Sequence, residues 1–258
     1  MWQDTFPDFH FLGLKVQGLT KADLLNVIES TIDSGANNSI IGNHNLHSLY
    51  LLRYSHEMRS FYQHNQYTHV DGMSLVMLGR LMGIPLRRIH RTGYLDWFNE
   101  FLALAESKSW RLYFLGGRQE VAVRLPSRLR GTYPNLLLRC HHGYDAFSPD
   151  TMVYEEIADF KPHIVLVGMG MPLQERWILG ARERVHTNLF LQCGAIMDYY
   201  TGVQRPSPRW MGQLGLEWLF RLVCRPRSLG SRYILEPLKL APEILGEIAV
   251  RRFQVGKS

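Results

Sequence analysis

The sequence predicts an α/β fold, with a Rossmann-like parallel sheet as its core and a basic helical appendage at its carboxyl end. Short aliphatic runs alternate with single helical patterns, which is typical of parallel βαβ units. The chain has 258 residues, 46% of them hydrophobic, and this is enough for a large core without disulfides. The pattern changes near residue 202, so we expect an α/β core at residues 1–202 and the appendage at residues 203–258.

Five runs are predicted to form strands because they are short and rich in β-branched or aliphatic residues. These runs are residues 38–42, 111–115, 136–139, 163–167 and 188–192. In open parallel sheets ligands bind beyond the carboxyl ends of the strands, so the turns that follow these runs are candidate sites.

Helical patterns fill the intervals between the predicted strands. The pattern at residues 20–35 begins with Thr20 and ends at Gly35, which are typical start and stop residues of a helix. Further helices are expected at residues 46–63, 74–83, 96–107, 119–133, 151–160 and 173–184.

The appendage carries the whole basic excess of the chain. Residues 1–200 contain 19 Lys and Arg against 19 Asp and Glu, whereas residues 201–258 contain 10 against 4. Prolines interrupt this segment, so we expect two or three short helices rich in Trp, Leu and Ile. Such a segment suits an anionic membrane surface, with its apolar side chains packed inward and its arginines facing outward. An apolar appendage also allows association into a homo-oligomer.

Several classes of protein are disfavoured. Neither a run of about 18 apolar residues nor a signal-like N-terminus is present, so we expect a cytoplasmic protein. No metal and no cofactor are predicted, because the three cysteines lack ligand spacing and no Asp-x-Asp pair occurs. The adjacent His141 and His142 are expected to point to opposite faces of a strand. Nucleic-acid binding lacks a recognised motif, and a dinucleotide oxidoreductase lacks its GxGxxG turn.

A first glycine turn follows the strand predicted at residues 111–115. Gly116 and Gly117 permit close backbone approach, and the next helix begins with unpaired N–H groups and the positive end of its dipole. Together these features offer a site for a pyrophosphate. The alternative interpretation is a tight turn with a purely structural role.

A second glycine turn follows the strand predicted at residues 163–167. Gly168, Gly170 and Pro172 precede a helix whose first turn contains Gln174 and Glu175. These polar side chains are suited to bind a ribose, uracil or sugar hydroxyl. The alternative is an ordinary helix start, where the helix dipole alone favours Glu.

Three polar residues lie close to the starts of other predicted helices, and Asp71 follows a polar segment of the chain. Asp71 precedes an apolar helix, where a carboxylate acts either as a general base in a pocket or as an N-cap. Asn43 and Asn45 follow the first predicted strand, and they either orient a sugar or serve as turn residues.

Taken together, several stretches resemble the WecG/TagA/CpsF family of bacterial glycosyltransferases, glycosyltransferase family 26. The stretches GMGMPLQE and RPSPRWMGQLGLEWLFRL are the specific ones, and the resemblance runs from about residue 10 to about residue 240. The matching stretches are residues 42–53, 70–76, 112–117, 133–144, 165–178, 193–222 and 225–234.

The resemblance implies an inverting transfer of a hexose or N-acetylhexosamine from a UDP-sugar. The implied acceptor is an undecaprenyl-diphosphate-linked sugar, and the implied location is peripheral, on the cytoplasmic face of the plasma membrane. Without a metal, the departing diphosphate would be stabilised by backbone N–H groups, helix dipoles and arginines.

The resemblance also implies roles for individual residues. Asp71 matches the proposed catalytic carboxylate, and Asn45 matches an asparagine at a strand end. Either Arg88 or Arg91 matches a basic residue near the diphosphate. Gln174 and Glu175 match polar residues of the sugar-nucleotide site. Arginines that match the basic appendage, implied to reach the lipid diphosphate, are Arg221, Arg225, Arg227 and Arg232.

Two departures from the family pattern bear on the donor sugar. Asn43 stands where a threonine is frequent, and Tyr94 lies in a TGYLDW stretch where other members read G-x-D-L. This form is more similar to members that make exopolysaccharides, which favours UDP-glucose as donor. The alternatives are a UDP-N-acetylmannosamine or N-acetylmannosaminuronate transferase and a non-catalytic, membrane-docked polysaccharide assembly protein.

Overall fold

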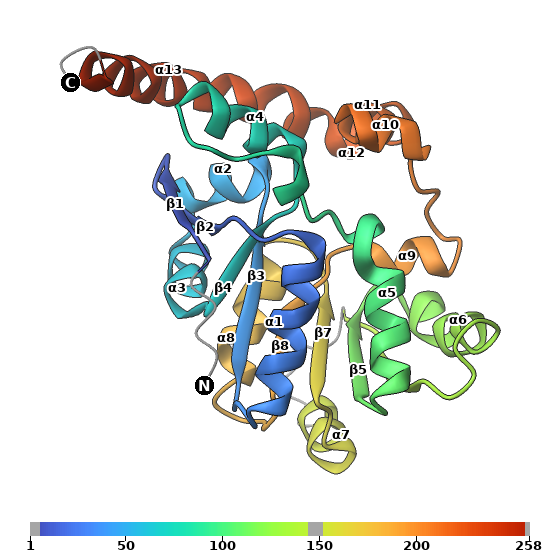
Figure 1. Ribbon diagram of the computed structural model, residues 1–258. Coiled ribbons are helices and arrows are strands. Elements are labelled where there is room, and N and C mark those ends of the chain that lie inside the picture. Colours follow the sequence, from blue (N-terminus) through green and yellow to red (C-terminus); the bar gives the residue numbers. More distant parts are fainter. Residues whose placement is uncertain (1–5, 144–151, 256–258) are drawn as a thin grey trace.

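The computed structural model describes residues 6–143 and 152–255, and a six-stranded parallel sheet forms its centre (Figure 1). The strand order is β4-β3-β8-β7-β5-β6. The strands are β3 (Ser39–His44), β4 (Tyr67–Val70), β5 (Arg111–Gly116), β6 (Leu137–His141), β7 (Ile164–Gly168) and β8 (Leu189–Gln192). This confirms the predicted Rossmann-like α/β core and all five predicted strands.

The sequence did not predict strand β4, which lies at one edge of the sheet. Its interior residues Thr68 and His69 are polar, so it lacks the aliphatic pattern of the other strands. Both residues are buried and form tertiary contacts: the Thr68 N–H donates to Gln17 Oε1 at 2.6 Å, and His69 Nδ1 lies 2.8 Å from Thr92 Oγ1. A hairpin of β1 (Asp8–Phe11) and β2 (Leu14–Gln17), also not predicted, supplies Gln17.

Helices cover both faces of the sheet, and alternation along the strands sends side chains to each. In β5, Leu112 and Phe114 pack with α1 and α5, whereas Tyr113 and Leu115 pack with α3, α7 and α8. The helices of this region are α1 (Lys21–Asp33), α2 (Leu46–Tyr54), α3 (His56–His64), α4 (Met73–Leu81), α5 (Tyr94–Ser107), α6 (Gln119–Arg130), α7 (Met152–Phe160), α8 (Leu173–Ala181) and α9 (Ile196–Tyr200).

Two helices replace the single helix predicted at residues 46–63. The break is at Ser55, whose hydroxyl accepts a hydrogen bond from the Met58 N–H at 3.2 Å and so caps α3. Helix α9 was not predicted. It follows β8 after a short turn and packs beside α6.

The appendage is helical, as predicted, but its last part is not broken into short helices. It comprises α10 (Arg209–Leu214), α11 (Glu217–Cys224), α12 (Pro226–Gly230), a π-helical turn (Ser231–Leu235) and α13 (Glu236–Val255). Helix α13 is 20 residues long and continues through Pro242. Pro237 is the second residue of α13, directly after the π-helical turn.

Helix α13 lies across the carboxyl edge of the sheet, above α2 and α4 (Figure 1). Leu240 is buried in one apolar cluster with Leu49 and Leu52 of α2. The Leu12 N–H donates to Glu247 at 2.7 Å, and Arg53 forms an ion pair with Glu243. The appendage is therefore packed onto the core. Within the described residues, no helix combines the length and apolarity needed to cross a membrane.

Candidate functional site

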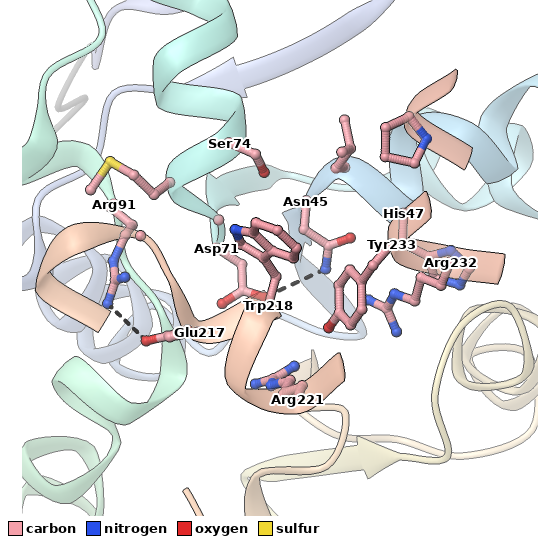
Figure 2. Close-up of a pocket in the computed structure, with 15 residues that line it drawn as sticks. Asn45, His47, Asp71, Ser74, Arg91, Glu217, Trp218, Arg221, Arg232 and Tyr233 are labelled. Atoms are coloured by element: carbon pink, nitrogen blue, oxygen red, sulfur yellow. Dashed lines mark hydrogen bonds and ion pairs between the residues drawn. The ribbon is translucent and has the colours of Figure 1, made fainter. Parts of the chain in front are cut away.

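Two polar side chains meet where the adjacent strands β3 and β4 end. Asn45 follows β3 and caps α2, since its Oδ1 accepts the Ser48 N–H at 3.1 Å. Asp71 follows β4, and Asn45 Nδ2 donates to Asp71 Oδ2 at 3.5 Å (Figure 2). Because parallel strands end at the same edge of a sheet, residues 26 positions apart in the sequence are brought into contact here.

Asp71 lies on the wall between two cavities, of about 350 Å³ and about 170 Å³. Five residues line both cavities: Asn45, Asp71, Glu217, Arg221 and Arg232. Two of these come from the core and three from the appendage, so the appendage closes a site that begins at the sheet. Figure 2 shows Asp71 and Asn45 facing the side chains of Trp218, Tyr233 and Arg221.

The smaller cavity lies over the ends of β7 and β8. Gly170, with φ +79°, and Gln174 line it from the second glycine turn, and Asn43 lines it from β3. Gln174 Oε1 accepts the Gly194 N–H at 3.2 Å, so the side chain is held by the turn after β8. A cavity wall that combines side-chain amides with glycine backbone suits a hydroxyl-rich ligand.

Burial raises the pKa of the Asp71 carboxyl, while the positive charge of Arg221, the hydrogen bond from Asn45 and the charges of Arg91 and Arg232 act to lower it. Burial prevails. A carboxylate with reduced hydration and a raised pKa is a better proton acceptor than an exposed one, and this is the property a general base needs.

Arg221 and Arg232 enter the site, against the expectation that the appendage arginines face outward. Arg221 lies over the ring of Tyr199, 5.8 Å from its centroid. Arg232 Nε is buried without a hydrogen-bond partner, and burial lowers the pKa of this guanidinium. A cation that is desolvated and unsatisfied in a cavity wall is suited to an anionic ligand. Arg225 and Arg227 are exposed and line neither cavity.

Of the two candidate arginines, Arg91 lies at the site and Arg88 does not. Arg91 lines the larger cavity, where it donates to the Gly212 carbonyl at 2.7 Å and forms ion pairs with Asp96 and Glu217. Arg88 is exposed in a short 3-10 helix (Arg88–His90) and lines neither cavity.

The first glycine turn lines neither cavity. A Cβ on Gly116 would meet the Gly168 carbonyl oxygen at 2.4 Å, and Gly117 has a φ of +65°. Both glycines are therefore required by the close packing of strand ends and the turn geometry. Gly168 is equally constrained, because its Cβ would lie 2.6 Å from the Gly194 carbonyl oxygen.

Pro172 and Glu175 belong to the second glycine turn without lining either cavity. Pro172 follows a cis peptide bond and precedes α8. Glu175 is fully buried, its Oε1 accepts from Gln174 Nε2 at 2.9 Å and its Oε2 has no partner. Burial raises the pKa of Glu175 to about 7.

Sequence reasoning missed several residues of the site. Glu217 lines both cavities, and Trp218 lines the larger one, although both lie in the GLEWL stretch that carries the resemblance. His47 lines the larger cavity and contacts Glu236 of α13 at 2.7 Å. The paired Glu-Trp at the start of an amphipathic helix was the available signal, but nothing in it indicated which face would meet the core.

The histidine pair differs from expectation. The rings of His141 and His142 stack at 4.6 Å, because His142 lies beyond the end of β6 and is freed from strand alternation. In residues 6–143 and 152–255, no three His, Cys, Asp or Glu side chains gather in a way that would hold a metal ion.

Comparison with known proteins gives a consistent result. Two curated relatives, from Staphylococcus aureus strains NCTC 8325 and COL, are named N-acetylglucosaminyldiphosphoundecaprenol N-acetyl-beta-D-mannosaminyltransferase. Each is 27% identical to this chain over 192 residues, which cover 74% of this chain and 72% of the relative. The profile described as "Glycosyl transferase WecG/TagA/CpsF family" matches residues 9–254. The chain therefore belongs to the WecG/TagA/CpsF family and is a glycosyltransferase.

Proposed function

We propose that this enzyme transfers an N-acetylmannosamine-type residue, with inversion, from a UDP-sugar to N-acetylglucosamine linked to a polyprenyl diphosphate. The names of the Staphylococcus aureus relatives support this donor and acceptor class. They favour the N-acetylmannosaminyl alternative over UDP-glucose, which Asn43 and Tyr94 had suggested. No comparison supports the glucose donor.

The observation that carries the proposal is the position of Asp71 between two cavities. We assign the donor sugar to the smaller cavity, beside Gly170 and Gln174, and the acceptor to the larger one. Asp71 faces both, so it can take the proton of the attacking acceptor hydroxyl. That hydroxyl attacks the anomeric carbon from the face opposite the diphosphate as the bond to UDP breaks.

The leaving group departs as UDP, and its negative charge needs stabilisation. Arg221 and Arg232 border both cavities and are the cations we assign to this role. In a site with little water their attraction for the diphosphate is stronger than on an open surface. Arg91 is not assigned this role, because it already forms an ion pair with Glu217.

We further propose that residues 203–258 dock the enzyme peripherally on the cytoplasmic face of the membrane. Apolar side chains exposed along the appendage include Trp210, Leu214, Val223, Ile234, Leu238 and Leu245. Arg225 and Arg227 are exposed among them and suit anionic headgroups. A homo-oligomer that buries the same side chains is the competing outcome, and sedimentation with and without anionic vesicles separates the two.

The test is a turnover assay with purified protein and farnesyl-diphosphate-linked N-acetylglucosamine as acceptor. UDP-N-acetylmannosamine, its uronate, UDP-N-acetylglucosamine and UDP-glucose are offered separately, with excess EDTA, and released UDP is measured. We expect UDP-N-acetylmannosamine to be used. Turnover of UDP-glucose alone would restore the glucose assignment. If no donor gives UDP release, although UDP raises the melting temperature of the protein, the proposed acceptor class is wrong.

A further inference from the structure

An apolar stripe on α4 leads out of the larger cavity to the surface. Met73 lines the cavity, and Met77 and Leu81 follow four and eight residues later on the same face of the helix. Met77 is 60% exposed and Leu81 is 54% exposed. The opposite face of α4 supplies core contacts through Leu75 and Val76. Met73 also packs against this cluster, whereas Met77 and Leu81 are not part of it.

The inner end of the stripe joins apolar to cationic surface. Trp218, Pro237, Arg221 and Arg232 line the same cavity as Met73. Gly215 makes room at this point, because a Cβ there would lie 2.8 Å from Met73 Cγ. A ligand that follows this surface meets positive charge at the inner end and hydrocarbon on the way out.

We propose that the stripe Met73–Met77–Leu81 binds the first isoprene units of the acceptor, while the acceptor diphosphate lies in the larger cavity. Arg221 and Arg232 line both cavities, so they meet the acceptor diphosphate from the larger cavity and the departing UDP from the smaller one. This inference rests on the proposed function for the identity of the acceptor. Three observations support an isoprenoid as occupant. The stripe continues directly from the cavity, the cavity is cationic, and two of the three side chains of the stripe are methionines. Methionine is flexible and adapts to an irregular hydrocarbon such as a branched, unsaturated chain.

The stripe differs from the apolar surface of the appendage in its direction. It runs along one helix of the core for two turns, about 12 Å at 1.5 Å per residue, and begins inside the site. Arg80, exposed beside Leu81 on the last turn, is placed to meet anionic headgroups where the chain enters the bilayer. The acceptor would thus reach Asp71 without leaving hydrocarbon surroundings along its tail.

The experiment compares two acceptors in which N-acetylglucosamine diphosphate carries either a farnesyl or a methyl group. The variant is Met77→Gln/Leu81→Gln, and the matched control is Val123→Gln, which changes a 71% exposed apolar residue on α6. We expect the double variant to raise KM for the farnesyl acceptor about tenfold. Values of kcat, KM for the methyl acceptor and KM for the UDP-sugar should stay unchanged, and Val123→Gln should change none of these.

Equal changes for the two acceptors, or no change for either, would overturn the inference. So would loss of vesicle binding in the double variant with an unchanged farnesyl-to-methyl ratio, since this would assign the stripe to the bilayer. A second measurement does not need turnover: the melting temperature with farnesyl diphosphate or methyl diphosphate. If wild-type protein is inactive but farnesyl diphosphate stabilises it more than the double variant, the stripe binds isoprenoid and the proposed function is wrong. Equal stabilisation of both proteins would remove the stripe as a binding site.

Discussion

The guanidinium of Arg91 lies 3.4 Å from the carboxylate of Glu217 and joins the sheet edge to the first turn of α11. The same guanidinium donates to the Gly212 carbonyl at 2.7 Å. Arg221 lies one helical turn beyond Glu217, on the same side of α11. Arg91 therefore fixes the helix that carries a cation into the site.

We expect Arg91→Ala to lower the free energy of unfolding by about 2–4 kcal/mol, because Glu217 is left half-buried without its cation. Turnover should fall as well, since α11 loses its attachment. Chemical denaturation and the UDP-release assay measure the two effects. Arg88→Ala is the comparison, because Arg88 is exposed outside both cavities, and its effect on stability should stay within about 0.5 kcal/mol. An equal loss in both variants would contradict the role given to Arg91.

Asp71→Asn should reduce kcat by about 10²- to 10⁴-fold, the range that removal of a general base produces. The amide preserves the size of the side chain but cannot accept the proton. UDP should still raise the melting temperature of the variant, because the smaller cavity keeps Gly170 and Gln174. Turnover close to wild type would remove Asp71 from the role of base.

The rate should be lost at low pH as Asp71 becomes protonated. Burial raises its pKa, so the acid limb of kcat/KM lies above the ordinary aspartate value of about 3.9. The charge of Arg221 lowers this pKa, and Arg221→Gln should therefore move the acid limb to higher pH. Arg227→Gln, which changes an exposed arginine outside both cavities, should leave the limb in place. A shift toward lower pH in Arg221→Gln would show that the two groups are not coupled as described.

Glu175 makes folding less favourable as pH rises. Burial raises its folded-state pKa to about 7, while an unfolded glutamate titrates near 4.5. Between these values the folded protein holds a proton that the unfolded chain has lost, so stability falls with increasing pH. Glu175→Gln removes this term, and the stability of wild type relative to the variant should drop by about 3 kcal/mol from pH 4.5 to pH 7.5. Chemical denaturation of both proteins at the two pH values measures this difference. An equal change in stability for wild type and variant would show that folding does not raise the pKa of Glu175.

The docking of α13 can be tested with two leucines of the same helix. Leu240 is 3% exposed and packs with α2, whereas Leu238 is 65% exposed. Leu240→Ala should cost about 2–5 kcal/mol of unfolding free energy, and Leu238→Ala should cost less than about 0.5 kcal/mol in the absence of membranes. If the two variants are equally stable, α13 is not part of the cooperative fold in solution.

Local sequence patterns were sufficient to predict much of the secondary structure of the core. The five aliphatic strands and helix α1 carry their signals within a few residues, because a buried strand or an amphipathic helix must show its period in its own sequence. Strand β4 carries no such signal, since its polar residues Thr68 and His69 form hydrogen bonds with Gln17 and Thr92 from other elements. The first predicted strand also placed Asn45 beyond a carboxyl end of the sheet.

The sequence by itself determined the α/β class, the strand-end position of Asn45 and the basic character of the appendage, because each of these depends on neighbours in the chain. Only the tertiary structure decided which arginines enter the site. Arg221 and Arg225 are four residues apart, but α11 ends at Cys224, so the helical phase that would align them is broken and only Arg221 lines the cavities. Arg232 returns to the same cavities through the π-helical turn. The direction of a side chain on the appendage is set by how α10–α13 pack on the core, and that packing depends on contacts between residues more than a hundred positions apart.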